Sequence, residues 1–340
     1  MTTLLLADER FLAHDPGPGH PERAERLRAV ARALERPPAG AVFITPRPAT
    51  EAELLRVHSK RYLDELAEAG RRGYVDLDPD TALSPGSHEA ALLAAGGALQ
   101  LVDEVAAGRA DNGFALVRPP GHHARPGAAM GFCLLNNAAI AAEALLHDHG
   151  LSRVLVIDWD VHHGNGTQEA FWSRRDVLYF STHRWPFYPG TGAVDEVGEG
   201  HGAGFTVNVP FLEGSTDADF HAAFRDVLLP IATQYAPQAI VVSAGFDAHV
   251  RDPLGGMRAT EAGFADLCAM TRDLAAKLSG GRLVLLLEGG YDLDALAAST
   301  RACAEVLCGA TAQAPGDGPT HAGGEAIREA IEVQRRFWRL

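Results

Sequence analysis

Cysteine is scarce in this sequence of 340 residues. Its four cysteines, Cys133, Cys268, Cys303 and Cys308, form no Cys-X-X-Cys pair. Scattered cysteines in a chain of this length are typical of small buried side chains, whereas a disulfide framework needs a denser pattern in a shorter chain. The cysteine pattern therefore argues against a disulfide-stapled scaffold and favours a reducing compartment.

Long apolar runs are also missing. No stretch approaches the ~20 consecutive apolar residues that a membrane-spanning helix needs. The apolar start, Thr2–Ala7, is too short for a signal peptide and is closed at once by Asp8, Glu9 and Arg10. We therefore expect a soluble, cytoplasmic protein that does not act on membranes.

Positive charge is in deficit. The 30 lysines and arginines face 44 aspartates and glutamates, which gives a formal net charge of −14. A nucleic-acid surface needs clustered positive charge, so we expect no nucleic-acid partner. The acidic balance is compatible with cationic substrates, although its usual effect is only to keep a protein soluble.

Short aliphatic and β-branched runs alternate with longer segments of helical apolar periodicity. This alternation is typical of a mainly parallel sheet that is covered on both faces by helices. We therefore predict the α/β class, as a three-layer α/β/α sandwich with about eight strands. The predicted strands are Thr3–Leu6, Ala41–Thr45, Gly113–Val117, Arg153–Asp158, Asp176–Ser181, Phe205–Val209, Gln238–Ser243 and Arg282–Glu288. The main predicted helical segments are Pro21–Glu35, Gly86–Ala107, Leu135–His149, Asp217–Tyr235 and Thr260–Leu278.

The sequence offers no clear domain boundary. It has no internal repeat, and α/β folds of this size commonly bury a single core. The only linker-like stretch, Gly309–Thr320, is followed by a short amphipathic helix. We therefore expect residues 1–340 to form one domain with a short C-terminal appendage after about residue 309.

Polar motifs follow five of the predicted strands. In open parallel sheets the ligand site forms beyond the carboxyl ends of the strands, so these motifs are the first candidates for a site. They are Arg118–His123 (RPPGHH), Asp158–Asn165 (DWDVHHGN), Ser181–His183 (STH), Ser243–Asp247 (SAGFD) and Glu288–Tyr291 (EGGY).

Three potential metal ligands follow one of these strands. Asp158, Asp160 and His162 alternate at i, i+2 and i+4, which places them on one face of an extended segment. They leave the apolar run Val154–Ile157, where unpaired charges are costly, so a metal site is favoured over a solvated turn. Asp247 has the same setting after another apolar strand and is a candidate for a further carboxylate ligand.

Two further motifs carry candidate proton donors and acceptors. His122 and His123 stand in tandem after a Pro-Pro-Gly turn, which favours proton transfer near neutral pH over packed or capping histidines. Tyr291 follows Gly289 and Gly290 at another strand end. On the sequence alone, this tyrosine is equally compatible with a loop residue whose hydroxyl lies in water.

Together these motifs resemble the histone deacetylase superfamily, and most of all its class II-like bacterial amidohydrolases, which include acetylpolyamine amidohydrolase relatives. The match runs in order from about His14 to the C-terminus, and it implies an arginase-like α/β/α fold. The matching motifs are Arg118–Ala124, Gly131–Cys133, Asp158–Gly166, Tyr188–Gly192, Ser243–Asp247, Asp252–Gly256 and Leu287–Tyr291.

The resemblance implies one catalytic zinc ion and one or two structural potassium ions. The zinc ligands would be Asp160, His162 and Asp247. The first potassium ion would lie beside Asp158, with the main chain of Asp160, His162 and Thr182 and the hydroxyl of Ser181 as its other ligands. A second monovalent cation would be held by the carbonyl groups of Phe171, Arg174, Val177 and Phe205.

The resemblance also implies a narrow acyl-lysine channel. Its walls would include Gly131, Phe132, Leu254 and Tyr188, where relatives usually carry phenylalanine. Ser84 aligns with a residue that hydrogen-bonds peptide substrates at the channel mouth.

The implied activity is zinc-dependent deacetylation, the hydrolysis of N-acetyl or N-acyl amides of lysine side chains. His123 would be the general base and then the general acid, and His122, held by Asp158, would contribute charge and orientation. Tyr291 would stabilise the oxyanion. Asn165 stands where class I members place an aspartate behind the second histidine, a change typical of class II members.

Several alternatives stay open. An acetylpolyamine deacetylase has the same chemistry, and the acidic run Asp76, Asp78 and Asp80 would attract a polycation if it lay near the channel mouth. Against it, polyamine-selective animal relatives carry glutamate at the position of Leu254. The long insertion that bacterial ones carry is absent between Tyr62 and Ser84. The substrate would thus be an acylated lysine peptide or a small acetylated amine, and a homo-oligomer remains an alternative to a monomer.

Two rival classes fit less well. A non-catalytic acyl-lysine binding module would not need His122, His123 and Tyr291, all of which are present. A binuclear manganese hydrolase of the arginase type would need a second ligand set, and none is complete in the sequence.

Overall fold

The eight predicted strands all form, and they make one sheet in a computed structural model that describes residues 1–340. The strand order is β2-β1-β5-β10-β9-β6-β7-β8, and every ladder between neighbours is parallel. The prediction of a mainly parallel sheet is confirmed. The strands are β1 (Thr3–Leu6), β2 (Ala41–Ile44), β5 (Asn112–Ala115), β6 (Val154–Asp158), β7 (Val177–Arg184), β8 (Thr206–Phe211), β9 (Ala239–Ala244) and β10 (Leu283–Leu287).

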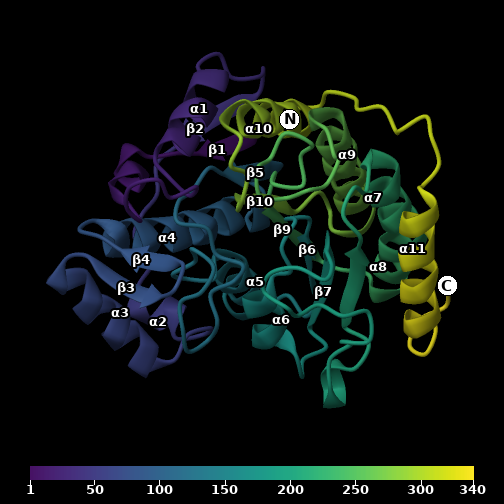
Figure 1. The fold of residues 1–340 in the computed structure, drawn as a ribbon, viewed down its shortest axis with the longest axis horizontal. Coiled ribbons are helices and arrows are strands. Elements are labelled where there is room, and N and C mark those ends of the chain that lie inside the picture. Colours follow the sequence, from purple (N-terminus) through teal and green to yellow (C-terminus); the bar gives the residue numbers. More distant parts are fainter.

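Helices lie on both sides of this sheet, as the layered prediction requires (Figure 1). On one side α1, α10, α9 and α7 pack in a row, and on the other α4 packs on α5, which packs on α6. The helices are α1 (Glu25–Ala33), α2 (Glu51–Leu54), α3 (Lys60–Arg72), α4 (Ser87–Ala106), α5 (Asn137–His147), α6 (Asn165–Phe171), α7 (Asp217–Ala223), α8 (Leu229–Tyr235), α9 (Glu261–Leu278), α10 (Leu293–Leu307) and α11 (His321–Gln334), with the 3-10 helices η1 (Glu9–Ala13) and η2 (Gly200–Gly202) and the π-helix η3 (Phe224–Leu228).

One buried apolar cluster of 88 residues spans both faces of the sheet. Strands β6, β9 and β10 lie at its centre, and every residue in them is buried. Because these strands are covered on both sides, they read as continuous aliphatic runs in the sequence. No helix is both long and apolar enough to cross a membrane, and the cytoplasmic location stays a prediction.

The segment predicted as a C-terminal appendage is attached to the edge of the sheet. Residues 310–320 have no regular structure, and α11 then packs on the edge strand β8. Gln334 donates from Nε2 to the carbonyl of Thr206 at 3.1 Å, and Trp338 donates from Nε1 to the carbonyl of Gly204 at 2.8 Å. The helix therefore shields an edge strand that would otherwise be open.

A small antiparallel hairpin, absent from the prediction, joins α3 to α4. Its strands are β3 (Val75–Asp78) and β4 (Thr81–Leu83), and Asp80 lies in the turn between them. The hairpin carries the acidic run whose location the sequence left open. Helices α2, α3, α6 and α10 were also not among the predicted segments.

Candidate active site

The polar motifs meet at the carboxyl ends of β5, β6, β9 and β10, which are neighbours in the sheet. Asp158 at the end of β6 is in register with Ser243 on β9, and Ser243 is in register with Leu286 on β10. A narrow cavity of about 80 Å³ opens above these ends. Its lining residues are Asp80, Pro120, His122, His123, Gly131, Phe132, His162, Tyr188, Leu254, Gly289 and Tyr291.

Asp160, His162 and Asp247 form a cluster whose ligand atoms all lie within 4.8 Å of one another, and all three residues are buried. His162 Nδ1 is 3.1 Å from both Asp160 Oδ1 and Asp247 Oδ2. Burial and the negative charge of Asp160 raise the pKa of Asp247 to about 7. Two buried carboxylates with one imidazole need a cation to offset their repulsion, and this donor set fits Zn²⁺ with positions left for water and substrate.

Main-chain donors orient the two carboxylates of this cluster. Gly289 donates its N–H to Asp160 Oδ2 at 2.8 Å, and Val161 donates to Asp247 Oδ1 at 2.8 Å. A Cβ atom at Gly289 would lie 2.2 Å from Asp247 Oδ2, so only glycine fits at that position. The backbone thus holds the ligand oxygens in place, as metal sites require of their surroundings.

The groups named for the first potassium ion share one neighbourhood beside the cluster. Asp158 accepts the main-chain N–H of Asp160 at 3.2 Å and is in register with Ser181 on β7. The Thr182 hydroxyl is buried without a hydrogen-bond partner. The fully buried Tyr179, which was not among the predicted site residues, donates its hydroxyl to Asp158 Oδ2 at 3.1 Å.

The groups named for a second cation lie around the start of β7. Phe171 ends α6, Val177 begins β7, and Phe205 immediately precedes β8. The Phe171 carbonyl accepts the N–H of Arg174 at 3.0 Å, and the Phe205 carbonyl accepts that of Tyr179 at 2.9 Å. Both potassium sites stay predictions.

The two histidines in tandem have opposite electrostatic surroundings. Burial alone would lower the pKa of His122, but the carboxylates of Asp158 and Asp160 raise it well above its usual value. His122 Nδ1 lies 3.0 Å from Asp158 Oδ2. Burial and the nearby His122 and His162 lower the pKa of His123 well below its usual value, and His123 Nδ1 lies 2.8 Å from Asn165 Oδ1. One histidine is therefore held as a cation and its neighbour as a neutral imidazole, a separation typical of acid and base partners.

Tyr291 lines the same cavity and does not have the exposed loop position that the sequence left open. Its main-chain N–H donates to Asp252 Oδ2 at 2.6 Å, and its ring packs edge-on against Phe132 with centroids 6.0 Å apart. Burial and the negative charge of Asp247 raise the pKa of Tyr291 well above its usual value. The hydroxyl therefore stays protonated at neutral pH and is available as a donor.

A buried ionic network supports the turn that carries Tyr291. Glu22 binds Arg26 at 2.9 Å and Arg118 at 2.7 Å, and all three side chains are fully buried. Arg26 then donates from Nε to the carbonyl of Gly290 at 2.7 Å. Sequence reasoning missed this network, although Glu22 and Arg26 stand four residues apart in a predicted helical segment, a spacing that allows pairing.

Of the five residues predicted for the substrate channel, the structure brings four together at the cavity. Gly131, Phe132, Tyr188 and Leu254 all line the cavity. A Cβ atom at Gly131 would lie 2.4 Å from His123 Cδ2, so glycine permits the close approach of the imidazole.

Ser84 does not line the cavity. Its hydroxyl accepts the N–H of Asp15 at 2.9 Å and lies 2.8 Å from the hydroxyl of Ser87. Asp80, in the hairpin turn, lines the cavity instead. Burial raises the pKa of its carboxyl above the ordinary value. The acidic side chain on the cavity wall therefore comes from the turn of the hairpin.

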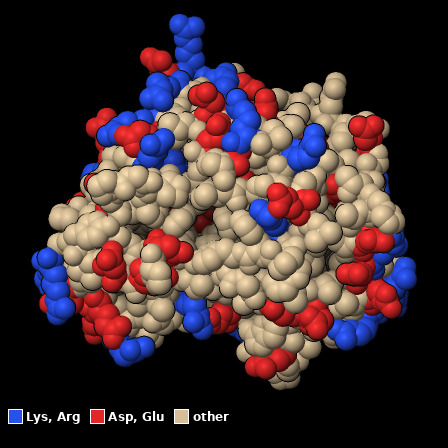
Figure 2. Space-filling view, viewed as in Figure 1, with Lys and Arg blue, Asp and Glu red and all other residues tan.

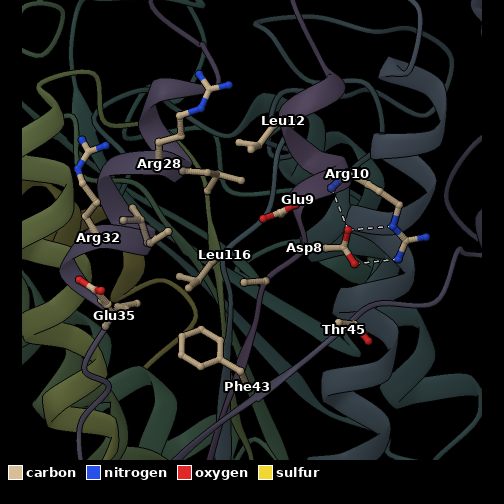
Figure 3. Close-up of a pocket in the computed structure, with 15 residues that line it drawn as sticks. Asp8, Glu9, Arg10, Leu12, Arg28, Arg32, Glu35, Phe43, Thr45 and Leu116 are labelled. Atoms are coloured by element: carbon tan, nitrogen blue, oxygen red, sulfur yellow. Dashed lines mark hydrogen bonds and ion pairs between the residues drawn. The ribbon is translucent and has the colours of Figure 1, made fainter.

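Two larger hollows lack this chemistry. One, of about 1000 Å³, lies between α1 and β2, with Arg28 and Arg32 on α1 and the ion pair of Asp8 and Arg10 across from them (Figure 3). Another, of about 680 Å³, is polar and adjoins Asn165. Neither contains the Asp160, His162 and Asp247 cluster. Figure 2 shows one face of the molecule, with charged side chains mainly at its periphery and a hollow near its centre.

Comparisons with known proteins agree with this geometry. A family model described as the histone deacetylase domain matches residues 20–307. The chain is 43% identical to histone deacetylase 15 of Arabidopsis thaliana, and the match covers 99% of this chain and 63% of that protein. It is also 43% identical to polyamine deacetylase HDAC10 of Homo sapiens, and that match covers 94% of this chain and 49% of the human protein. It is 46% identical to a histone deacetylase-like amidohydrolase of Pseudomonas aeruginosa over 72% and 64%. The solved structure of the HDA15 HD domain matches with a TM-score of 0.93 and 43% identity, covering 99% of this chain and 95% of that one. The chain thus spans about half to two thirds of the length of these three relatives.

Proposed function

Because the chain belongs to the histone deacetylase family, we propose that it is a zinc-dependent deacetylase that hydrolyses N-acetyl or N-acyl amides of lysine side chains. The observation that carries the proposal is the convergence of three groups of residues on one narrow cavity. These are the metal-ligand cluster, whose His162 lines the cavity, the histidine pair and the buried Tyr291. Metal-assisted amide hydrolysis uses all three, as an electrophile, a base and an oxyanion donor.

Asp160, His162 and Asp247 would hold the zinc ion. When bound, Zn²⁺ supplies a Lewis acid for the substrate carbonyl and lowers the pKa of water from ~15.7 toward ~7. We also propose structural potassium at the sites named above, supported for the first site by the buried carboxylate of Asp158, which is in register with Ser181 on the neighbouring strand. Asp158 would link the first potassium site to the catalytic residues, since it contacts His122 and the main chain of the proposed zinc ligand Asp160.

His123 is the proposed general base. Its Nδ1 carries the proton, because the amide oxygen of Asn165 accepts from it at 2.8 Å, while the Asn165 amide nitrogen lies 3.4 Å from the sulfur of Met130. This leaves Nε2 as the free acceptor in a neutral imidazole. The same atom then returns the proton to the leaving amine.

His122 and Tyr291 have supporting roles in this proposal. His122 remains a cation, held by Asp158, and its charge offsets the negative charge that develops when water attacks the amide. The protonated hydroxyl of Tyr291 donates a hydrogen bond to the oxyanion. Neither residue loses its proton during the cycle.

Hydrolysis of acylated lysine by the purified protein tests the proposal. We expect release of acetate from an acetyl-lysine peptide, and inhibition by a hydroxamate long enough to reach the zinc along the channel. A protein that hydrolyses neither acetyl-lysine nor acetylpolyamines, and that saturating hydroxamate does not bind, would contradict it.

Acetylpolyamine deacetylation is the second candidate, and one feature favours it. Asp80 places a carboxylate on the cavity wall, where it would attract the cationic tail of an acetylated polyamine. The similarity to a polyamine deacetylase points the same way. Leu254, which also lines the cavity, is apolar and favours an acyl-lysine side chain. The ratio of kcat/KM for acetylspermidine to that for an acetyl-lysine peptide decides between the two.

A further inference from the structure

Glu288 has a fully buried carboxylate to which the proposed mechanism assigns no role. It follows β10 directly, at the carboxyl ends of the strands, where the site forms. Its Oε2 accepts the main-chain N–H of Gly121 at 2.6 Å and that of His122 at 3.2 Å, and its Oε1 accepts the hydroxyl of Ser243 at 3.0 Å. A single carboxylate therefore joins three separate segments of the candidate site.

The main chain around Glu288 extends these connections. Its own N–H donates to the carbonyl of Ala244 at 3.2 Å, and the next residue, Gly289, donates to Asp160. Its carbonyl accepts from Arg26. The carboxylate thus ties the turn of the histidine pair to a segment that is itself hydrogen-bonded to a proposed zinc ligand.

The turn before the histidine pair is packed too tightly for its main-chain N–H groups to reach another hydrogen-bond acceptor without moving. A Cβ atom at Gly121 would lie 2.6 Å from the main-chain nitrogen of Asn137, so the turn is packed tightly against the start of α5. Without the Glu288 carboxylate, the N–H groups of Gly121 and His122 would lose their acceptor in a place that water does not reach. The turn would then shift to find new acceptors.

We propose that Glu288 is a positioning residue, which holds the main chain of Gly121 and His122 so that the histidine pair faces the proposed zinc ligands. The inference rests on the proposed function, because the histidines act only if the chain is a deacetylase. Displacing a reacting group by about 1 Å typically costs ~10²-fold in rate. Loss of the carboxylate should therefore lower kcat and leave substrate binding nearly unchanged.

Asp219 offers a matched control. It is also a fully buried carboxylate that accepts main-chain N–H groups, from Thr216 at 2.7 Å and from Thr320 at 2.6 Å. It lies in α7 beside α11, away from the cavity. Replacing it removes the same kind of interaction without touching the histidine turn.

The test compares three variants by kcat per active site, with active sites counted by titration with a tight hydroxamate. Glu288→Ala should lower kcat ~10²-fold with KM within about threefold. Glu288→Gln should stay within ~10-fold of wild type, because its amide oxygen still accepts the two N–H groups and its NH₂ donates to Ser243. Asp219→Ala should lower Tm while kcat per active site stays unchanged.

Three kinetic outcomes would overturn the inference. Glu288→Ala with an unchanged kcat per active site would mean a merely structural role, and Glu288→Gln as slow as Glu288→Ala would mean that charge, not hydrogen bonding, matters. If Glu288→Ala does not fold, Glu288→Asp replaces it, since its shorter carboxylate cannot reach Gly121, and wild-type kcat in that variant would equally refute positioning.

A spectroscopic readout separates this inference from the proposed function. The Nδ1 proton of His122, shared with Asp158, should give a low-field NMR signal that moves in Glu288→Ala and stays in place in Asp219→Ala. If the wild-type protein hydrolyses neither substrate class, the proposed function fails, and this signal still tests the positioning. A signal that does not move in Glu288→Ala would refute it.

Discussion

The main-chain N–H of Gly289 donates a hydrogen bond to Asp160 Oδ2 at 2.8 Å, which connects the turn before Tyr291 to one of the three proposed zinc ligands. The donor and the acceptor lie 129 residues apart in the sequence, each just beyond the end of its strand, β10 for Gly289 and β6 for Asp160. The proposed oxyanion donor and the proposed metal site therefore share one support. A substitution that moves the main chain at Gly289 should therefore disturb both the oxyanion donor and the metal site, whereas one that leaves this main chain intact should affect only one of them.

Tyr291→Phe leaves that main chain intact and removes only the hydroxyl. Because an oxyanion donor acts in the transition state, kcat should fall ~10²-fold or more, about 2.7 kcal/mol on the barrier, with little change in KM. Steady-state kinetics on an acetyl-lysine peptide give both constants. Zinc content and Tm should match the wild type, and a variant within a few-fold of wild-type kcat would defeat the assignment.

Zinc stoichiometry tests the ligand cluster. We expect one zinc ion per chain in the dialysed wild-type protein, and well below one in Asp247→Ala, because the variant loses one of three protein ligands. Elemental analysis measures both. Asp266→Asn is a suitable control, since Asp266 is also buried but bonds to His221, away from the cavity. Full occupancy in Asp247→Ala would remove it from the ligand set.

Leu254→Glu should shift substrate preference toward polyamines. It adds a second carboxylate to a cavity wall that already carries Asp80. A close charge pair in such a setting is worth at least ~1.4 kcal/mol, so the kcat/KM ratio of acetylspermidine to an acetyl-lysine peptide should rise ~10-fold or more. Leu254→Gln has the same size without the charge. An equal shift in both variants would mean that shape, not charge, sets the preference.

Buried His58 should make the protein less stable in acid. Its Nδ1 donates to the carbonyl of Arg125 at 3.1 Å and its Nε2 accepts the N–H of Asn136 at 3.0 Å, so the neutral imidazole is fully bonded. Burial lowers the pKa of His58 to about 4. Its contribution is therefore complete above the unfolded-state pKa of ~6.5 and is lost as the pH falls through about 4, up to ~3 kcal/mol.

Denaturant unfolding of wild type and His58→Gln at several pH values measures this contribution. The variant should be less stable at pH ~7, because it loses the fitted imidazole, but the gap should narrow toward pH ~4 as the wild type loses its advantage. A gap that stays constant across this pH range would show that His58 does not titrate as described.

The sheet and the main site were predictable from sequence for a physical reason. Strands buried on both faces, such as β6 and β10, must be continuously apolar. Charged residues that directly follow such an apolar run are therefore easy to recognise in the sequence as candidate site residues. Asp160 and Asp247 stand out in this way. The tandem histidines and Tyr291 follow glycine-containing turns at other strand ends, so the same rule found them.

The supporting residues were not predictable in this way. Glu22 and Arg118 are charged residues, which are usually exposed, and they pair across 96 residues of sequence. Asp80 reaches the cavity only because β3 and β4 form a hairpin, and acidic residues seldom occur in strands. Ser84 was expected at the channel mouth from an alignment with the family. That expectation failed because an alignment cannot place a turn that the local sequence does not specify. The domain organisation and the bound ions stay predictions.

Zinc-dependent hydrolysis is the central claim, and reconstitution of the metal-free protein tests it most directly. The protein is stripped with a chelator and titrated with Zn²⁺, while acetate release from an acetyl-lysine peptide and from acetylspermidine is followed. We predict no turnover without metal, and turnover that rises with zinc to a plateau at one ion per chain, with His123→Ala inactive at the plateau. Turnover that is independent of zinc, or equal turnover in His123→Ala, would contradict this account.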